Sequence, residues 1–476
     1  MSDPNGTADV DCVVVGAGFS GIYATHRLRE SGKSVRCFDA GSDIGGVWNW
    51  NRYPGATVDV LSRDYSYSFS DDLQQDWQWS MRFSRQPEII RYQKHVAERF
   101  GLTPHIQLQT RVTATIDDER ACLWRVETDQ GDTLSARFVV MACGHLSALN
   151  KPDFPGLDQF AGEVHHTGGW PREEVRLAGK RVAVVGTGSS GIQAITAIAP
   201  QVEQLYVLQR TPHFSLPINV AAKLKPNGYP IGTKRICLDE GYYETFNREN
   251  VQLVSLQEAP ITRFTENGVV IAGEEIALDM VIFSTGYDAF TGSLFKIDIR
   301  GKADTTLPEK WADGPSTYLG LATAGSPHFF ILQGPGSRSV FVNLVTGGSS
   351  RSTGSPIASI IWTSMVWTRL KQRPRPRRTG ARIAPGWSGA ACSRKRNRGG
   401  AAPISPASCG FSMPAWVASR ITRRGAPPPA ATITTAFRSP LAPCRMPADP
   451  QQYLADAALG DPRRFATTGD RPGSRA

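Results

Sequence analysis

A glycine-rich turn between a strand and a helix occurs twice in this chain, and this repeat constrains the fold more than any other feature. The first copy, GAGFSG at residues 16–21, follows the apolar run DCVVV at 11–15 and precedes a stretch with helical spacing. The second copy, GTGSSG at 186–191, stands in the same relation to RVAVV at 181–185. Each copy predicts a β-α-β unit. We therefore expect an α/β fold with two doubly wound, mostly parallel, Rossmann-like sheets that carry helices on both faces.

The spacing of the glycines in the first turn is that of dinucleotide-binding sites. Gly16 allows the tight turn, Gly18 lets the backbone approach a pyrophosphate, and Gly21 permits close packing of helix and strand. The N-terminus of the helix attracts the phosphate charge. The next strand ends at Asp39, where a carboxylate can bond a ribose hydroxyl. The alternative is a glycine-rich turn without a ligand.

The second turn, with Gly186, Gly188 and Gly191, leads to a strand with a different end. This strand ends in Arg210 and Thr211 instead of an acid. A guanidinium pairs with a 2′-phosphate that a carboxylate would repel, so this unit favours NADP over NAD. The two turns together predict a flavin in the first unit and NADPH in the second, with hydride passing from nicotinamide to flavin. The alternative for Arg210 is a solvated charge at a strand end.

These patterns divide the chain into four parts. Residues 1–150 are expected to form the first part of an FAD-binding domain, and residues 151–275 an NADP-binding domain. Residues 276–350 are expected to return to the FAD-binding domain. Residues 351–476 form an Arg- and Pro-rich segment in which helical and strand periodicity ends.

The net charge of +10 is concentrated in this last segment. Residues 1–350 carry a formal charge of −7, whereas residues 351–476 carry +17 and hold 16 of the 33 prolines, 19 Arg and no Glu. This composition predicts either a disordered basic tail or the out-of-frame translation of a GC-rich gene. A nucleic-acid-binding tail is the alternative. No helical basic face accompanies the arginines, so we expect no nucleic-acid partner.

The remaining composition bears on compartment and metal binding. No run approaches the roughly 18 apolar residues of a membrane helix, so we expect no membrane partner. The N-terminus shows no signal-peptide pattern. Eight cysteines stand singly without a C-x-x-C, which argues against a zinc ribbon or a disulfide scaffold. We expect a cytoplasmic, reduced protein without a metal site.

The segment between the two turns carries a longer motif, FAGEVHHTGGWP, at residues 160–171. It matches F-x-G-x-x-x-H-x-x-x-W-P, the fingerprint of Baeyer–Villiger monooxygenases, and the chain resembles the phenylacetone- and cyclohexanone-type enzymes of that family over about residues 8–345. The fixed positions of the fingerprint are Phe160, Gly162, His166, Trp170 and Pro171. The resemblance extends to GGVWNWNRYPG at 45–55, GYPIGTKR at 228–235, STGYD at 284–288 and GPGS at 334–337.

The resemblance implies a defined activity. In this family NADPH reduces FAD, and the reduced flavin uses O2 to insert one oxygen atom next to the carbonyl of a small-molecule ketone, which gives an ester or a lactone. The resemblance implies that Arg235 is the catalytic arginine that stabilises the oxygenating anion electrostatically. Asp59 matches the catalytic carboxylate that positions this arginine, and Lys234 matches a second contact to the 2′-phosphate.

The resemblance also implies a set of cofactor contacts. Those expected for FAD are Gly16, Gly18, Ser20, Gly21, Asp39, Gly46, Val47, Trp48, Asn49, Trp50, Asp59, Tyr65 and Val112. Those expected for NADP are Thr57, Val58, Asp59, Gly186, Thr187, Gly188, Ser189, Ser190, Gly191, Ile192, Arg210, Thr211, Lys234 and Arg235. His166 of the fingerprint is expected in the cofactor region, and Leu344 matches a position beside the flavin and the substrate.

The chain departs from the family pattern at two places. The long helical insertion that normally follows Pro217 is missing, and residues 351–476 lack the family's C-terminal helix and its loop over NADP. These departures leave open a non-catalytic nucleotide-binding remnant. The other alternative is a flavin-containing or N-hydroxylating monooxygenase, a class that lacks the Trp-Pro end of the fingerprint. The sequence predicts neither the ketone nor the oligomeric state.

Overall fold

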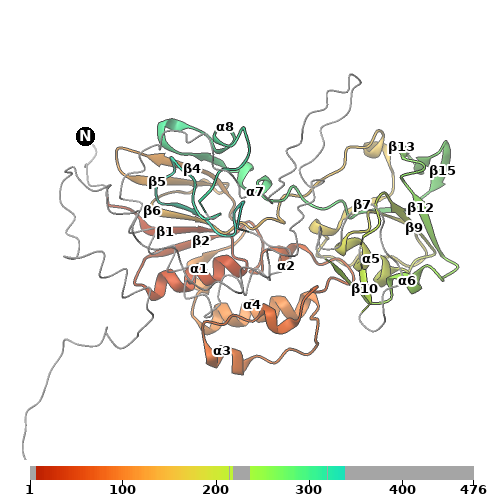
Figure 1. Ribbon diagram of the computed structural model, residues 1–476, viewed down its shortest axis with the longest axis horizontal. Coiled ribbons are helices and arrows are strands. Elements are labelled where there is room, and N and C mark those ends of the chain that lie inside the picture. The colour runs from red at the N-terminus through yellow and green to blue at the C-terminus, as the bar shows by residue number, and fades with distance from the viewer. Residues whose placement is uncertain (1–6, 214, 218–235, 319, 338–476) are drawn as a thin grey trace, which may run out of the picture.

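The computed structural model describes residues 7–213, 215–217, 236–318 and 320–337, which form two units built around separate sheets (Figure 1). The sequence-based prediction of an α/β fold with two Rossmann-like units is confirmed. The predicted tail at 351–476 lies outside the described residues, as do Lys234, Arg235 and Leu344.

The first sheet is mixed, with its parallel part at the glycine-rich turn. Strand β1 pairs in parallel with β2 and β6, whereas β4, β5 and β6 form an antiparallel meander. The strands in spatial order are β17 (Asp298–Arg300), β4 (Val112–Asp118), β5 (Leu123–Thr128), β6 (Thr133–Met141), β1 (Val10–Val15), β2 (Val35–Phe38) and β3 (Ile106–Gln107), and β18 (Phe329–Ile331) pairs with β6.

Alternating side chains of β1 enter two different cores. Cys12 and Val14 pack toward helix α1 (Phe19–Glu30), and Val13 and Val15 pack toward the opposite face. This alternation follows from the period of two along a strand. The opposite face is covered by the short helices α7 (Gly292–Phe295) and α8 (Leu307–Lys310), with the 3₁₀ turn η5 (Lys302–Asp304) between them.

Helices α3 (Asp71–Asp76) and α4 (Gln86–Arg99) lie beneath α1 (Figure 1), and an aromatic cluster joins α1 to this region. Tyr67 and Tyr92 are buried in it, and the hydroxyl of Tyr67 donates a hydrogen bond to the carbonyl oxygen of Phe19 at 2.6 Å. This contact fixes the start of α1 from outside the sheet. The other elements of this region are α2 (Val47–Trp50), η1 (Ser62–Tyr65) and η2 (Thr103–His105).

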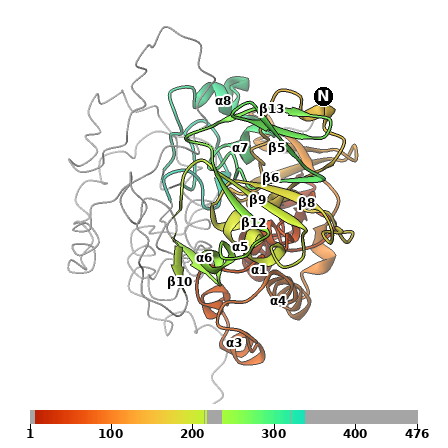
Figure 2. The same ribbon diagram turned by 90° about the vertical axis from the view of Figure 1, so that its right-hand side faces the viewer.

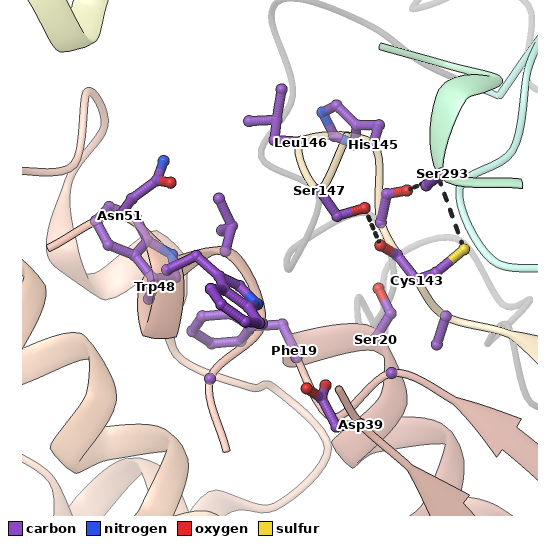
Figure 3. A pocket seen from close by; sticks show the side chains of 18 of the residues that line it. Phe19, Ser20, Asp39, Trp48, Asn51, Cys143, His145, Leu146, Ser147 and Ser293 are labelled. Atoms are coloured by element: carbon purple, nitrogen blue, oxygen red, sulfur yellow. Dashed lines mark hydrogen bonds between the residues drawn. The ribbon is translucent and has the colours of Figure 1, made fainter. Parts of the chain in front are cut away.

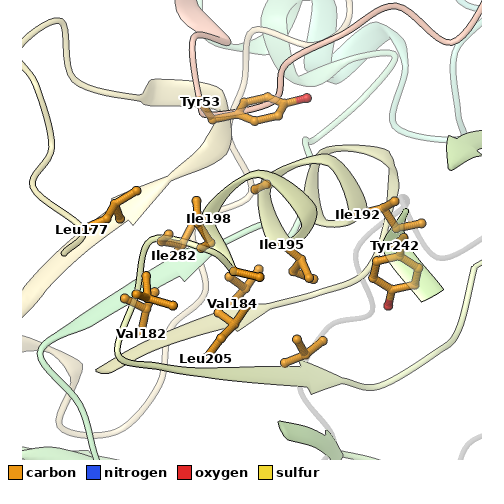
Figure 4. Close-up of a cluster of buried hydrophobic side chains, with 14 of the residues drawn as sticks. Tyr53, Leu177, Val182, Val184, Ile192, Ile195, Ile198, Leu205, Tyr242 and Ile282 are labelled. Atoms are coloured by element: carbon orange, nitrogen blue, oxygen red, sulfur yellow. The ribbon is translucent and has the colours of Figure 1, made fainter. Parts of the chain in front are cut away.

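The second sheet is entirely parallel, and its strands lie side by side in Figure 2. In spatial order they are β12 (Val251–Ser255), β9 (Gln204–Gln209), β8 (Arg181–Val185), β16 (Met280–Phe283) and β7 (Glu163–His166). Helices α5 (Ser189–Ile198) and α6 (Tyr242–Thr245) cover one face, where apolar side chains of α5 pack on Val184, Leu205 and Ile282 (Figure 4). Burying each such side chain stabilises the fold by roughly 1.5–3 kcal/mol.

The other face of the second sheet is covered by strands, so the prediction of helices on both faces is wrong here. Strands β13 (Ile261–Thr265), β14 (Gly268–Ile271) and β15 (Glu274–Ala277) form an antiparallel meander against this face. Phe160 and Phe264 fill the interface. The reason lies in the local sequence, since Glu266-Asn267 and Ala272-Gly273 are turn residues between short runs of strand-forming side chains.

The chain returns to the first sheet later than predicted. Strand β16 pairs between β7 and β8 of the second sheet, so the boundary at residue 276 is wrong and the return follows Phe283. The return segment runs beside the outgoing one, because the N–H of Asn150 donates to the carbonyl of Gly286 at 3.1 Å and the N–H of Asp288 donates to that of Ala148 at 2.9 Å.

The remaining short elements are η3 (Leu157–Gln159), η4 (Thr167–Gly169), β10 (Ser215–Pro217) and β11 (Cys237–Asp239). Strands β10 and β11 form a two-stranded parallel sheet of their own. Within the described part of the chain, none of the helices has the length and apolar character needed to cross a membrane.

Candidate cofactor sites

A cavity of about 470 Å³ opens where β1 and β6 end, and most of the predicted flavin contacts line it (Figure 3). This edge, outside the carboxyl ends of the parallel strands, is where open α/β sheets bind ligands. The predicted residues that the structure brings together in its wall are Gly16, Gly18, Ser20, Asp39, Gly46, Val47, Trp48, Trp50, Thr57, Val58, Asp59, Tyr65, Val112, Ser189 and Ser190.

The first glycine-rich turn forms the floor of this cavity. A Cβ atom at Gly21 would lie 1.7 Å from the carbonyl oxygen of Gly16, so only glycine allows helix α1 this close to the end of β1. No side chain caps α1 at Gly18. The N–H groups of its first turn are therefore left for an anion, as in other dinucleotide sites. The turn fits a pyrophosphate group.

Asp39 stands at the end of β2, beside the turn. Its side chain is 8% exposed, and its carboxylate accepts hydrogen bonds from the N–H of Ala17 at 2.6 Å and from the N–H of Gly41 at 2.7 Å. Burial raises the pKa of this carboxyl, and the two backbone hydrogen bonds oppose that rise. Asp39 thus fixes the turn and also lines the cavity, where a ribose hydroxyl can reach it.

Aromatic side chains form one wall of the cavity (Figure 3). Trp48 of α2 meets the ring of Tyr65 edge to face at 5.7 Å, and Phe19 lies 5.5 Å from the same ring. Asn49 does not line the cavity, although it was predicted to contact FAD. It is buried, and its side-chain oxygen accepts hydrogen bonds from Arg52 and Arg172.

The opposite wall comes from the segment after β6, which the motifs did not predict (Figure 3). It comprises residues 143–147, and it is held by hydrogen bonds from the hydroxyl of Ser147 to the carbonyl of Cys143 at 3.0 Å and from Ser293 to that of Gly144 at 2.7 Å. His145 and Leu146 belong to this wall. The sequence indicates this wall only through its position in the chain, because the segment directly follows β6, the strand that pairs with β1.

Asp59 joins the two units. Its carboxylate accepts a hydrogen bond from the hydroxyl of Ser189 at 2.8 Å and another from the side-chain N–H of Gln193 at 3.4 Å. Both donors belong to α5, the helix of the second glycine-rich turn, whereas Asp59 belongs to the wall of the flavin cavity. This predicted residue therefore lies between the two predicted cofactor sites.

The second turn repeats the geometry of the first with one difference. A Cβ at Gly191 would lie 2.2 Å from the carbonyl oxygen of Gly186, but a Cβ at Gly188 would meet no atom within 4 Å. Thr187 accepts a hydrogen bond from the side chain of Gln209 at 3.0 Å. The space in front of the second turn is thus open.

The residues predicted to contact NADP divide into two groups in the structure. Thr57, Val58, Asp59, Ser189 and Ser190 line the cavity. Gly186, Thr187, Gly188, Gly191, Ile192, Arg210 and Thr211 do not line it and gather around the start of α5 and the end of β9. In this second group Arg210 is exposed, whereas Ile192 is buried in the core beneath α5.

The fingerprint lies in the second unit, on β7 and the segments that flank it, and does not line the cavity. His166 accepts a hydrogen bond at Nδ1 from the N–H of Gly168 at 3.0 Å, and its Nε2 lies 3.3 Å from the hydroxyl of Thr285. Burial lowers the pKa of His166, so the ring is neutral near pH 7. A Cβ at Gly168 would lie 2.4 Å from the hydroxyl oxygen of Tyr287, which donates to Asn51 at 2.7 Å.

Comparison with known proteins decides the family. Residues 10–237 match the family described as flavin-binding monooxygenase-like. A protein of Pseudooceanicola batsensis named Baeyer-Villiger monooxygenase is 35% identical over an alignment of 427 residues, and the match covers 69% of this chain and 78% of that protein. This chain belongs to the Baeyer–Villiger monooxygenases.

Further relatives of this monooxygenase agree with that assignment. Cyclohexanone 1,2-monooxygenase of an Acinetobacter species is 32% identical over an alignment of 424 residues, and the match covers 69% of this chain and 78% of that enzyme. The crystal structure of OTEMO in complex with FAD and NADP is 33% identical, covers 75% of this chain and 86% of its own, and superposes with a TM-score of 0.71. Fold and sequence therefore point to the same family.

Proposed function

We propose that this Baeyer–Villiger monooxygenase binds FAD and NADPH and inserts one oxygen atom of O2 next to the carbonyl of a ketone. The observation that carries this proposal is the position of Asp59. Its carboxylate lines the cavity of the first unit and is hydrogen-bonded to Ser189, in the first turn of the second unit's helix α5. One acidic group thus lies where the two cofactor sites meet.

The residues of the first unit fit FAD. The approach of Gly21 to Gly16 brings the start of α1 against the end of β1, and Asp39 presents a carboxylate at the end of β2. The aromatic wall of Phe19, Trp48 and Tyr65 provides flat apolar surfaces. When bound, FAD accepts hydride and uses O2 to oxygenate the substrate, chemistry that no amino-acid side chain supplies.

The residues around the second turn fit NADPH. The open space in front of Gly188 accommodates a pyrophosphate, and the start of α5 offers unpaired N–H groups to it. The exposed guanidinium of Arg210 stands at the end of β9, where it can pair with a 2′-phosphate. Lys234, outside the described residues, is proposed as a second contact to this phosphate.

The proposed catalytic groups are Asp59 and Arg235. Arg235 lies outside the described residues, and its proposed role is to stabilise negative charge that develops on oxygen. Asp59 is proposed to hold this arginine in place while its own carboxylate is fixed by α5. The aromatic wall excludes water from the cavity, which strengthens electrostatic interactions within it.

The substrate class is proposed from the relatives. Cyclohexanone 1,2-monooxygenase is named for a cyclic ketone, which supports a ketone as the substrate of this chain. We place the enzyme in the cytoplasm. Support comes from the cysteines, because Cys12, Cys37 and Cys122 are free thiols in the described part of the chain.

Anaerobic mixing of the purified full chain with NADPH tests the proposal. We expect a yellow protein whose flavin absorbance bleaches with NADPH and returns on admission of air, with ester formed when a ketone is present. A protein that binds FAD but is not reduced by NADPH would support the non-catalytic remnant and contradict the proposal. Formation of an N-oxide from an amine, with no ester from any ketone, would favour the N-hydroxylating alternative.

A further inference from the structure

Gln193 links the two units at the Asp59 carboxylate, although no sequence motif singles it out. It lies on α5, two residues after Gly191, and its side chain is half-buried against the loop 53–59 of the first unit. The contact is close, because a Cβ atom at Gly55 would lie 2.5 Å from the carbonyl oxygen of Gln193.

The side-chain amide of Gln193 uses all of its hydrogen-bonding capacity in this contact. Its Oε1 accepts from the hydroxyl of Tyr53 at 2.7 Å and from the N–H of Thr57 at 3.3 Å. Its Nε2 donates to the carbonyl oxygen of Thr57 at 3.0 Å and to Oδ1 of Asp59 at 3.4 Å. Since a primary amide offers two N–H donors and two acceptor lone pairs, no further partner is needed.

The four partners also determine which way the amide points. The carbonyl of Thr57 and the carboxylate of Asp59 only accept, and the N–H of Thr57 only donates. Burial raises the pKa of Tyr53, so its hydroxyl stays protonated and donates. If the side-chain amide of Gln193 were flipped, its oxygen would face the carbonyl of Thr57 and the carboxylate of Asp59, which both only accept. Buried polar groups would then be left unpaired.

The same loop is held on its far side by the start of α4. The N–H of Val58 donates to the carbonyl oxygen of Ser84 at 3.1 Å, and Thr57 forms an antiparallel bridge with Arg85. The backbone that leads into Asp59 therefore runs between two fixed supports. Ser189 holds the second oxygen of the carboxylate at 2.8 Å. Side chains of α5 therefore bond both oxygens of the Asp59 carboxylate and fix its direction.

We propose that Gln193 is a positioning residue for the reaction, which sets the Asp59 carboxylate between the two cofactor sites. This inference rests on the proposed function, in which Asp59 acts where hydride passes from NADPH to FAD. Gln193 does not line the flavin cavity. Its effect on the rate passes through Asp59, and misplacement of a reacting geometry by about 1 Å can cost about 100-fold in rate.

The substitution Gln193→Leu tests this role, because leucine fills similar space without the amide. We expect the limiting rate of anaerobic flavin reduction by NADPH to fall about 10- to 100-fold, while the dissociation constant of NADPH changes by less than about threefold. Gln201→Leu is the matched control. Gln201 is exposed just past α5, and its side chain donates to the carbonyl of Ala197 within the same segment, so the rate of this variant should equal that of the parent.

A double-mutant cycle with Asp59→Asn distinguishes an effect of Gln193 that passes through Asp59 from an effect that is independent of Asp59. If Gln193 acts through Asp59, the substitution Gln193→Leu slows reduction in the parent but adds less than about twofold in the Asp59→Asn background. An equal loss in both backgrounds would show that Gln193 acts independently and would overturn the inference. A full reduction rate in Asp59→Asn alone would instead refute the proposed function of Asp59.

Gln193→Glu keeps the test decisive if the leucine variant fails to fold. Glutamate has the same shape but sets an acceptor against the Asp59 carboxylate and the carbonyl of Thr57. Bound FAD and the thermal unfolding midpoint report whether each variant is folded. We expect the folded glutamate variant to reduce its flavin at least about tenfold more slowly. A rate equal to that of the parent would contradict the inference.

Discussion

The substitution Gly188→Ala should affect the stability of the fold and the affinity for a bound dinucleotide in opposite directions. The backbone of Gly188 has φ −77° and ψ −172°, which alanine adopts without strain. An alanine Cβ would meet no protein atom within 4 Å. The protein alone therefore tolerates this side chain. Its free energy of unfolding should rise slightly, by up to about 1 kcal/mol, because alanine restricts the unfolded chain.

The bound state should respond in the opposite direction. The open space in front of Gly188 is where we place the pyrophosphate of NADPH, so the methyl group would occupy part of that site. Crowding by one methyl group in a fitted site costs about 1–3 kcal/mol, which corresponds to a loss of affinity for NADPH of about 5- to 150-fold. FAD binding should be unchanged, since Gly188 does not line the flavin cavity.

Two measurements check this prediction. Thermal unfolding of the apoprotein should show no loss of stability, and the dependence of anaerobic flavin reduction on NADPH concentration should shift to higher concentration. An affinity for NADPH within about twofold of the parent would show that no ligand approaches this turn. That result would refute the placement of NADPH in the second unit.

Three further predictions concern single side chains. Gly21→Ala should yield protein without FAD, since its Cβ would lie 1.7 Å from the oxygen of Gly16, and retention of full flavin absorbance would contradict the first site. The parent should bind NADPH at least about tenfold more tightly than NADH, and Arg210→Ala should shrink that ratio by weakening NADPH alone; equal affinities in the parent would argue against the 2′-phosphate contact. Hydrogen bonds from Arg181 lower the pKa of Asp279 to about 2. Asp279 should therefore stabilise the fold at a pH above its unfolded pKa of 3.8, and this stabilisation should be lost as the pH falls toward 2. The substitution Asp279→Asn should remove this pH dependence. With both side chains about 40% exposed, the loss at pH 7 should stay below about 1 kcal/mol, and a larger loss in urea titrations would contradict this expectation.

The parts of the fold that were predictable from sequence are those that a local pattern encodes. The strand, turn and helix around Gly16 and Gly186 follow from apolar runs and glycine spacing, because the same short segment contains both the cause and the result. The position of Asp39 at the end of β2 follows in the same way. These features account for Gly16, Gly18, Ser20, Asp39, Ser189 and Ser190 in the wall of the cavity.

The parts that were not predictable depend on contacts between distant segments. Strand β16 resembles any buried strand, and only its pairing with β7 and β8 assigns it to the second sheet. The wall at residues 143–147 mixes Cys, Gly, His, Leu and Ser without a repeating pattern, so composition gives no signal for it. Gln193 shows the same limit, since its function arises from a loop 136 residues earlier in the chain.

Incorporation of labelled oxygen tests the central claim most directly. The purified full chain, supplied with FAD, NADPH and cyclohexanone, is incubated under ¹⁸O2, and the products are analysed by mass spectrometry. We expect a lactone that carries one ¹⁸O atom, formed in proportion to the NADPH consumed. Consumption of NADPH with hydrogen peroxide as the sole oxygen product, or a lactone without the label, would contradict the claim.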